Sequence, residues 1–183
     1  MEIMFDVIVS ALAIGALAQY SWSARGHFKS EGMPRGAKLL TLVVLACAIL
    51  MFALVWSSEQ PLVAHLVGIG LIVASYWLFW AAIQASRSAT LLLAFDPGNP
   101  QSFVSTGPYR YVRHPFYVSY TIFWGGWAIA SWSIWALLPL VFMVGLYVGA
   151  ARDEERKFAL TGMATAYQDY RRRTGFFFPK FLG

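Results

Sequence analysis

GPYRYVRHPFYVSY, which spans Gly107 to Tyr120, is the stretch around which the rest of the chain is interpreted. It places two arginines, one histidine, two prolines and four tyrosines directly before an apolar segment. Pro108 and Pro115 each restrict the backbone angle φ, so the polar side chains between them lie on a restrained backbone. An arginine and a proline at the start of a membrane helix also have a purely structural explanation. The combination of hydrogen-bond donors, a titratable ring and aromatic faces nevertheless indicates a binding site for a charged ligand.

The composition of the chain is that of a membrane protein. Of its 183 residues, 58% are hydrophobic and 13% are charged, whereas about a quarter of a soluble domain is charged. The formal net charge of +5 does not indicate a nucleic-acid partner, because basic residues beside apolar helices are expected of any membrane protein. Glu2 and Asp6 stand where a signal peptide would begin with basic residues, so the first apolar segment is predicted to be a membrane span.

Five apolar segments approach the length that a helix needs to cross a bilayer, which is about 20 residues. They are Ile3–Trp22, Leu39–Ser57, Leu62–Ile83, Phe116–Ser131 and Trp132–Ala150. The last two are expected to form a hairpin with a tight turn at Ser131 to Ser133. The sequence therefore predicts an all-α fold, with residues 1–183 forming a single polytopic membrane domain of about five transmembrane helices and a cytoplasmic C-terminal helical segment. It does not specify an oligomeric state.

The distribution of lysine and arginine predicts the orientation of these spans. Loops on the cytoplasmic side of membrane proteins carry an excess of both residues. If the N-terminus is outside and the C-terminus is in the cytoplasm, every lysine and arginine falls on the cytoplasmic side. They are Arg25, Lys29, Arg35, Lys38, Arg87, Arg110, Arg113, Arg152, Arg156, Lys157, Arg171, Arg172, Arg173 and Lys180. Residues 95–117 and 151–183 are therefore predicted to share the cytoplasmic face, where they could form a pocket.

A second charged stretch, RDEERK, follows the fifth predicted span from Arg152 to Lys157. Its structural explanation is a solvated helical turn of mixed charges. Carboxylates at the membrane edge, able to fold back beside the histidine, would also suit a cationic group such as an amino-acid ammonium. Beyond this stretch, a stripe at helical spacing predicts one more helix, through Leu160, Met163, Tyr167 and Tyr170. Arg171 to Arg173 are expected to contact lipid phosphates.

Sequence motifs for several other chemistries are absent from the sequence. It contains no Walker-type phosphate loop, no GxGxxG, no HExxH and no GxSxG. The single cysteine, Cys47, lies within an apolar segment, so neither a metal site nor a disulfide framework is predicted. Gly125 and Gly126 are predicted to allow close helix packing rather than to contact a cofactor.

Four stretches taken in order carry a family resemblance: GPYRYVRHPFY, an apolar hairpin, DEERKF and AYQDYRRRTGFFFP. Together they resemble the isoprenylcysteine carboxyl methyltransferase family of integral membrane enzymes, and they are similar also to the phospholipid methyltransferases. The resemblance covers roughly Gln101 to Phe181. It implies an S-adenosylmethionine-dependent methyltransferase acting at the membrane on a lipophilic acceptor, either an isoprenylcysteine-type carboxylate or a lipid-like small molecule.

The resemblance also implies which residues form the site, with residues 95–117 and 151–183 as the cofactor segments. The expected cofactor contacts are Gln101, Ser102, Phe103, Val104, Tyr109, His114, Pro115, Phe116, Tyr117, Glu154 and Glu155. Ala151 stands where the family has a substrate-facing arginine, and Arg152 is its nearest replacement, so His114 and Arg152 are the expected catalytic residues. A carboxylate acceptor would need a cation such as Arg152. An amine or thiol acceptor would have to lose a proton, and His114 is the nearby residue with a suitable unperturbed pKa.

Two alternatives remain open from the sequence. Membrane sterol reductases that use NADPH carry a similar RHPNY element, although Phe116 replaces their asparagine here. A non-catalytic membrane scaffold is the other alternative. The partners expected of the methyltransferase are a lipophilic small molecule or a lipidated acceptor, together with membrane lipids, and no nucleic acid.

Overall fold

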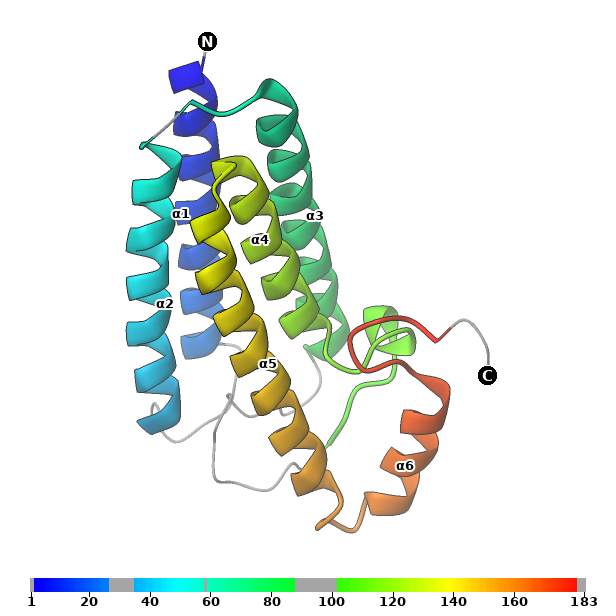
Figure 1. The fold of residues 1–183 in the computed structure, drawn as a ribbon. Coiled ribbons are helices and arrows are strands. Elements are labelled where there is room, and N and C mark those ends of the chain that lie inside the picture. Colours follow the sequence, from blue (N-terminus) through cyan, green and yellow to red (C-terminus); the bar gives the residue numbers. More distant parts are fainter. Residues whose placement is uncertain (1, 27–34, 58, 88–101, 181–183) are drawn as a thin grey trace.

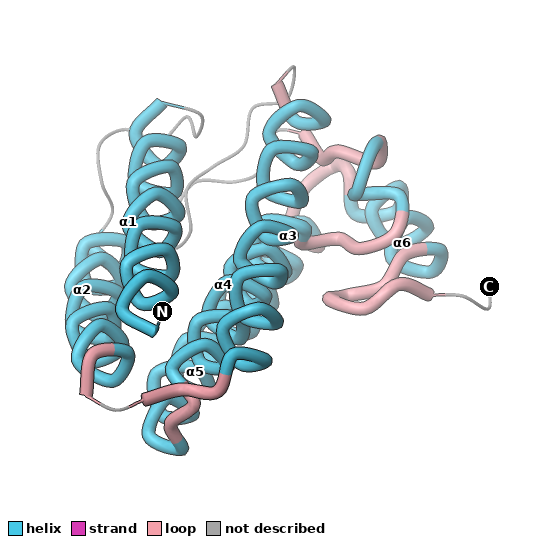
Figure 2. Tube along the Cα trace, turned by 90° about the horizontal axis from the view of Figure 1, so that it is seen from above, coloured by secondary structure: helices cyan, strands magenta, loops and turns pink. Residues whose placement is uncertain are grey.

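The computed structural model describes residues 2–26, 35–57, 59–87 and 102–180. Figure 1 shows the long helices running alongside one another, with α6 and the C-terminal loop beyond one end, and Figure 2 shows the same bundle from above. The helices are α1 (Glu2–Gly26), α2 (Arg35–Val55), α3 (Leu62–Ser86), α4 (Pro115–Ser131), α5 (Leu137–Phe158) and α6 (Ala164–Arg173), with short 3₁₀ turns η1 (Gly107–Arg110) and η2 (Ile134–Ala136). The predicted all-α fold is confirmed, and the N-terminus lies at the end of the bundle opposite α6 (Figure 1).

Four of these helices are long and apolar enough to span a membrane: α1, α2, α3 and α5 together with η2. The prediction of about five spans is therefore confirmed, with α4 as the shorter fifth member. α4 has 17 residues, and at 1.5 Å per residue it is about 25 Å long. Its side chains form the centre of the core, where Phe123, Trp124 and Trp127 are almost completely buried.

Two glycines set the distance between α3 and α4. A Cβ atom on Gly68 would lie 2.6 Å from the backbone oxygen of Gly126, and one on Gly126 would lie 2.9 Å from the backbone oxygen of Gly68. Both distances are too short for an alanine unless the helices move apart. A Cβ on Gly125 would meet nothing within 4 Å. The predicted packing role of the glycine pair is thus confirmed for Gly126.

Polar contacts fix α1 against α3 along their length. Asp6 Oδ1 and His65 Nε2 are 3.0 Å apart near the first turns of the two helices, and both residues are buried. The Tyr76 hydroxyl donates to the Leu12 carbonyl at 2.7 Å. Because an unpaired polar group is costly in hydrocarbon, these pairs specify the register of α1 on α3.

The boundaries of the fifth span differ from the prediction at both ends. Trp132 adopts a left-handed conformation with φ of 48°, and η2 follows, so α5 begins only at Leu137. At the other end α5 continues to Phe158, because its last turns contain good helix formers and neither glycine nor proline. The helix therefore begins and ends later in the chain than the predicted span Trp132–Ala150. The acidic pair belongs to α5 itself rather than to a segment that folds back after it.

The last helix is shorter than the predicted stripe. α6 begins at Ala164, and Leu160 is 82% exposed in the turn before it, so the predicted helix through Leu160 was wrong. Gly162 lies in this turn, where it lowers helix propensity. Tyr167 and Tyr170 are buried, however, and share one face of α6 as their spacing predicts.

Candidate functional site

The motif segment is held in place by the C-terminal segment, which is far away in the sequence. Pro108 occupies the first turn of η1, where its missing N–H needs no partner. Gly107 begins that turn with φ of 57°, a conformation that favours glycine. Two backbone hydrogen bonds then join the segments: the Arg113 N–H donates to the Gly175 carbonyl at 2.8 Å, and the Gly175 N–H donates to the Tyr111 carbonyl at 3.0 Å.

Arg113 and Glu155 form the centre of the site. Arg113 Nε lies 2.6 Å from Glu155 Oε1, and each side chain is only 8% exposed. The Arg113 guanidinium also donates to the Thr174 carbonyl and stacks over Phe176, 5.7 Å from the ring centre. Since buried charges are tolerated only when they are paired and hydrogen-bonded, these contacts explain how the pair is stable there.

His114 is the last residue before α4, and both of its ring nitrogens face carboxylates. Nε2 is 3.2 Å from Glu155 Oε1, and Nδ1 is 3.6 Å from Glu154 Oε2. Burial alone would lower the pKa of His114, but the hydrogen bonds and negative charges of Glu154 and Glu155 outweigh it and raise the pKa. The rings of Phe176 and Phe177 cover the imidazole at 5.1 and 6.2 Å between ring centres.

Glu154 and Glu155 are adjacent on α5 but have different surroundings. Both oxygens of Glu155 are engaged, because Oε1 contacts Arg113 and His114 while Oε2 lies 3.1 Å from Arg171 Nε. Glu154 accepts a hydrogen bond from the Tyr117 hydroxyl and has a side chain that is 32% exposed. Both carboxylates therefore have internal partners, and Glu154 is the more exposed of the two.

An aromatic wall stands beside this cluster. Phe103 packs against Tyr170 in a stacked geometry at 5.3 Å and against Tyr167 edge-on at 5.5 Å. Tyr167 in turn stacks on Phe158 at 4.1 Å. The Tyr170 hydroxyl donates to the Tyr109 carbonyl at 2.8 Å, which ties the wall to the motif segment.

Most of the residues predicted for the site lie together in two adjacent groups. One cluster contains His114, Tyr117, Glu154 and Glu155. The aromatic wall beside it contains Phe103 and Tyr109, and the segments that hold these residues also contain Val104 and Pro115, which are buried. The ring of Phe116 packs on Phe79 of α3 at 5.6 Å between ring centres, and Ser102 is partly buried. Gln101 lies outside the described residues. Arg152 is exposed on α5, so its role in acceptor recognition stays a prediction.

Sequence reasoning missed the cations that hold Glu155. Arg113 was interpreted as a charge at a helix start, and Arg171 as a lipid contact, yet both bind the same carboxylate. The available signal was their presence in the two stretches that carry the resemblance, RHP and YRRRTGFFFP. A helix period does not reveal which arginine of α6 contacts Glu155, because that depends on how α6 is placed against α5.

Comparisons with known proteins identify the family. The model of the phospholipid methyltransferase family matches residues 63–169, more than half of the chain and all of the stretch from α3 to the middle of α6. The chain belongs to the phospholipid methyltransferase family. It is also similar to a methanethiol S-methyltransferase of a Pseudomonas species, with 29% identity over 95% of this chain and 74% of the relative. A methanethiol S-methyltransferase 2 of Bradyrhizobium diazoefficiens is 28% identical, over 95% of this chain and 73% of that relative.

Membership of the phospholipid methyltransferase family confirms the main prediction from the sequence. The chain is a membrane methyltransferase that acts on a small lipophilic substrate, and the reductase alternative is not favoured. The four long apolar helices found among the described residues show that it is embedded in a membrane. The buried charges between α4, α5 and α6 then form the candidate active site of this methyltransferase.

Proposed function

We propose that the chain transfers a methyl group from S-adenosylmethionine to a small lipophilic thiol at the cytoplasmic face of the membrane. The observation that carries the proposal is the pair of carboxylates on α5, one buried and one partly exposed, next to a histidine and an aromatic wall. The partly exposed carboxylate suits the ammonium group of the methyl donor, and the aromatic wall suits its adenine. The acceptor class is supported by the thiol named for both relatives.

The side chains present fit the proposed methyl donor. Glu154 is a carboxylate with a 32% exposed side chain, and a carboxylate accepts charge-assisted hydrogen bonds from an ammonium. Phe103, which is only partly buried, offers an aromatic surface for an adenine. When bound, S-adenosylmethionine supplies an electrophilic methyl group attached to a sulfonium.

A thiol fits the interior of the bundle better than a carboxylate does. Ala151 stands where the related family has an arginine, and its uncharged methyl group offers no cation to a carboxylate acceptor. This residue is also fully buried. Close by, Tyr117 and Tyr147 stack at 5.7 Å between ring centres, and the Trp124 indole donates to the Tyr147 hydroxyl at 3.0 Å. Sulfur makes favourable contacts with aromatic rings, and these neutral aromatic surfaces suit a small thiol.

The residues of the chain would act mainly by positioning the reactants and managing one proton. The thiol S–H bond breaks, its proton passes to the neutral imidazole of His114, and the electron pair left on the sulfur forms the new S–CH₃ bond. The bond between that methyl group and the sulfonium sulfur breaks, and its electron pair stays on the departing sulfur as a neutral thioether. The imidazolium of His114, favoured by its raised pKa, would return its proton to water after the products leave, while Phe176 and Phe177 exclude water around the ring during the transfer.

The orientation in the membrane is part of the proposal. An outer N-terminus places every lysine and arginine on the cytoplasmic side, where the donor is available. A tag after Gly183 is then protected in sealed cells, whereas a tag before Met1 is accessible. The reverse labelling pattern would contradict this orientation.

A direct assay tests the activity. Purified protein in lipid nanodiscs is incubated with methyl-labelled S-adenosylmethionine and, in separate reactions, methanethiol, a prenylcysteine or an amine-bearing phospholipid. Label is expected in dimethyl sulfide and at background in the other two products. Glu154→Gln should reduce the transfer, and Arg156→Gln, an exposed change on the same helix, serves as the control. Labelling of the prenylcysteine or the lipid instead of the thiol would overturn the acceptor class.

A binding experiment separates the methyl donor from the nicotinamide alternative. Calorimetric titration of the same preparation with S-adenosylhomocysteine should give saturable binding, and titration with NADPH should give none. Binding of NADPH alone would favour a reductase. Binding of neither compound would favour a scaffold and refute the proposed activity.

A further inference from the structure

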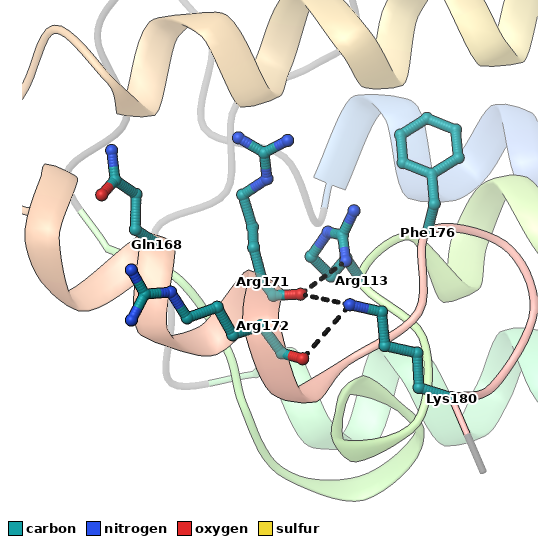
Figure 3. Close-up of a pocket in the computed structure, with 6 residues that line it drawn as sticks. All are labelled: Arg113, Gln168, Arg171, Arg172, Phe176 and Lys180. Carbon is teal, nitrogen blue, oxygen red and sulfur yellow. Dashed lines mark hydrogen bonds between the residues drawn. The ribbon is translucent and has the colours of Figure 1, made fainter. Parts of the chain in front are cut away.

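A basic pocket lies beside the candidate active site and shares Arg113 with it. Figure 3 shows it, with a volume of about 450 Å³ and a lining of Arg113, Gln168, Arg171, Arg172, Phe176 and Lys180. Four of the six lining side chains are cationic. They come from the motif segment, from α6 and from the C-terminal segment, so the pocket forms only when these three parts of the chain are assembled.

The charges around this pocket are not balanced. Glu155, which is not part of the pocket lining, neutralises part of the charge of Arg113 and Arg171. Within the described part of the chain, the acidic partner of Arg172 is Asp169, at 3.9 Å, and the side chains of that pair are 81% and 60% exposed. Four cations therefore face two carboxylates, and this excess favours an anionic ligand.

Lys180 completes the rim of the pocket. Its Nζ donates to the carbonyls of Arg171 and Arg172 at 3.1 and 3.2 Å, as Figure 3 shows. These carbonyls lie at the C-terminal end of α6, where a cation is favourable. The contact holds the Lys180 ammonium at the backbone of Arg172, and both exposed cations line the same pocket, where an anionic phosphate group can bind between them.

The depth of the pocket in the membrane points to the source of that phosphate. Arg113 is two residues before the first residue of α4, a membrane-embedded helix, so the pocket lies at the level of the lipid headgroups. Phe176 adds an apolar ring to the same lining. We infer that the pocket binds the phosphate of an anionic phospholipid, which acts as a bound partner of the enzyme and not as its methyl acceptor.

Such a lipid would stabilise the C-terminal segment against the motif segment. The Arg113 N–H and its guanidinium donate to carbonyls of Gly175 and Thr174 in that segment. Holding Arg172 and Lys180 to one phosphate therefore fixes the segment that positions Arg113. The inference concerns binding alone, and it holds whichever acceptor the enzyme methylates.

Lipid binding to the full chain tests the inference. The protein is placed in nanodiscs of phosphatidylcholine with increasing phosphatidylglycerol, which has no amine to be methylated, and bound lipid is counted by native mass spectrometry. Thermal unfolding is measured on the same samples. The variant Arg172→Ala/Lys180→Ala is compared with Arg173→Ala, which removes a cation from the same helix outside the pocket lining.

Wild type and Arg173→Ala are expected to retain phosphatidylglycerol and to unfold at a higher temperature when it is present. The double variant should bind it more than tenfold more weakly, because each direct charge-assisted hydrogen bond to a phosphate contributes about tenfold or more in affinity. Equal weakening in Arg173→Ala would overturn the inference, since it would show a diffuse surface charge. Stabilisation by inorganic phosphate in pure phosphatidylcholine, with no added effect of phosphatidylglycerol, would also overturn it.

Discussion

Replacing the two adjacent glutamates by glutamine, one at a time, tests whether they do different tasks. Glu155→Gln removes the charge opposite Arg113, His114 and Arg171, and the amide N–H₂ replaces an oxygen that these donors need. Breaking a buried ion pair costs about 3 to 5 kcal/mol. The glutamine keeps one acceptor oxygen, so we expect a loss of about 2 to 3 kcal/mol in the free energy of unfolding. That loss corresponds to a fall in Tm of about 5 °C or more.

Glu154→Gln should have the opposite profile. The side chain of Glu154 is 32% exposed, so solvent screens its contribution to stability and we expect Tm to change by less than about 2 °C. The lost charge-assisted bond to the donor's ammonium is worth about 1.5 to 3 kcal/mol, and S-adenosylhomocysteine should bind about 10- to 100-fold more weakly.

Both variants are measured by calorimetric titration with S-adenosylhomocysteine and by thermal unfolding in the same detergent. Glu154→Asp, which keeps the charge on a shorter side chain, should recover part of the affinity. The reasoning is refuted if Glu154→Gln binds like wild type while Glu155→Gln loses affinity at unchanged Tm. That result would make Glu155 the direct ligand and the internal ion pair unimportant.

Three further predictions follow from the described contacts. The pKa of His114 is raised in the folded protein, so the stabilisation that this histidine contributes is complete below its unfolded pKa of about 6.5 and is lost as the pH rises through its folded pKa. Tm should therefore fall over that pH interval in wild type and not in His114→Asn. Gly68→Ala should lower stability by about 1 to 3 kcal/mol, whereas Gly125→Ala, which meets no atom within 4 Å, should not. Arg152→Ala should raise the KM for the acceptor without changing donor affinity if Arg152 replaces the family's arginine; an unchanged KM would assign it to the surface.

The spans could be predicted because the bilayer imposes a strong and local constraint. Each long helix must be apolar over about 20 residues, and this requirement is visible in one continuous stretch of sequence. The ends of the spans were harder to predict. The boundary near Trp132 depends on one left-handed residue, and the boundary near Phe158 lies beyond the apolar stretch, where charged residues continue the same helix.

The site was predicted only in part. His114 and the acidic pair were predicted because they lie in two of the stretches that carry the family resemblance, GPYRYVRHPFY and DEERKF. Their partners did not stand out, since an arginine beside a span is ordinary. The distinction between Glu154 and Glu155 arises from the helix: consecutive residues are separated by about 100° around the axis. One therefore points into the cluster between Arg113 and Arg171, and the other points to its edge.

The internal ion pairs also explain how a small helical bundle provides a defined site at the membrane edge. Arg113 precedes α4, Glu155 belongs to α5 and Arg171 belongs to α6, so one carboxylate joins three elements before any ligand binds. A methyl transfer needs in-line geometry and exclusion of water more than it needs strong acids or bases. A preformed charge cluster meets the first need, because it fixes His114 and Glu154 relative to each other. The rings of Phe176 and Phe177 meet the second, because they cover the histidine.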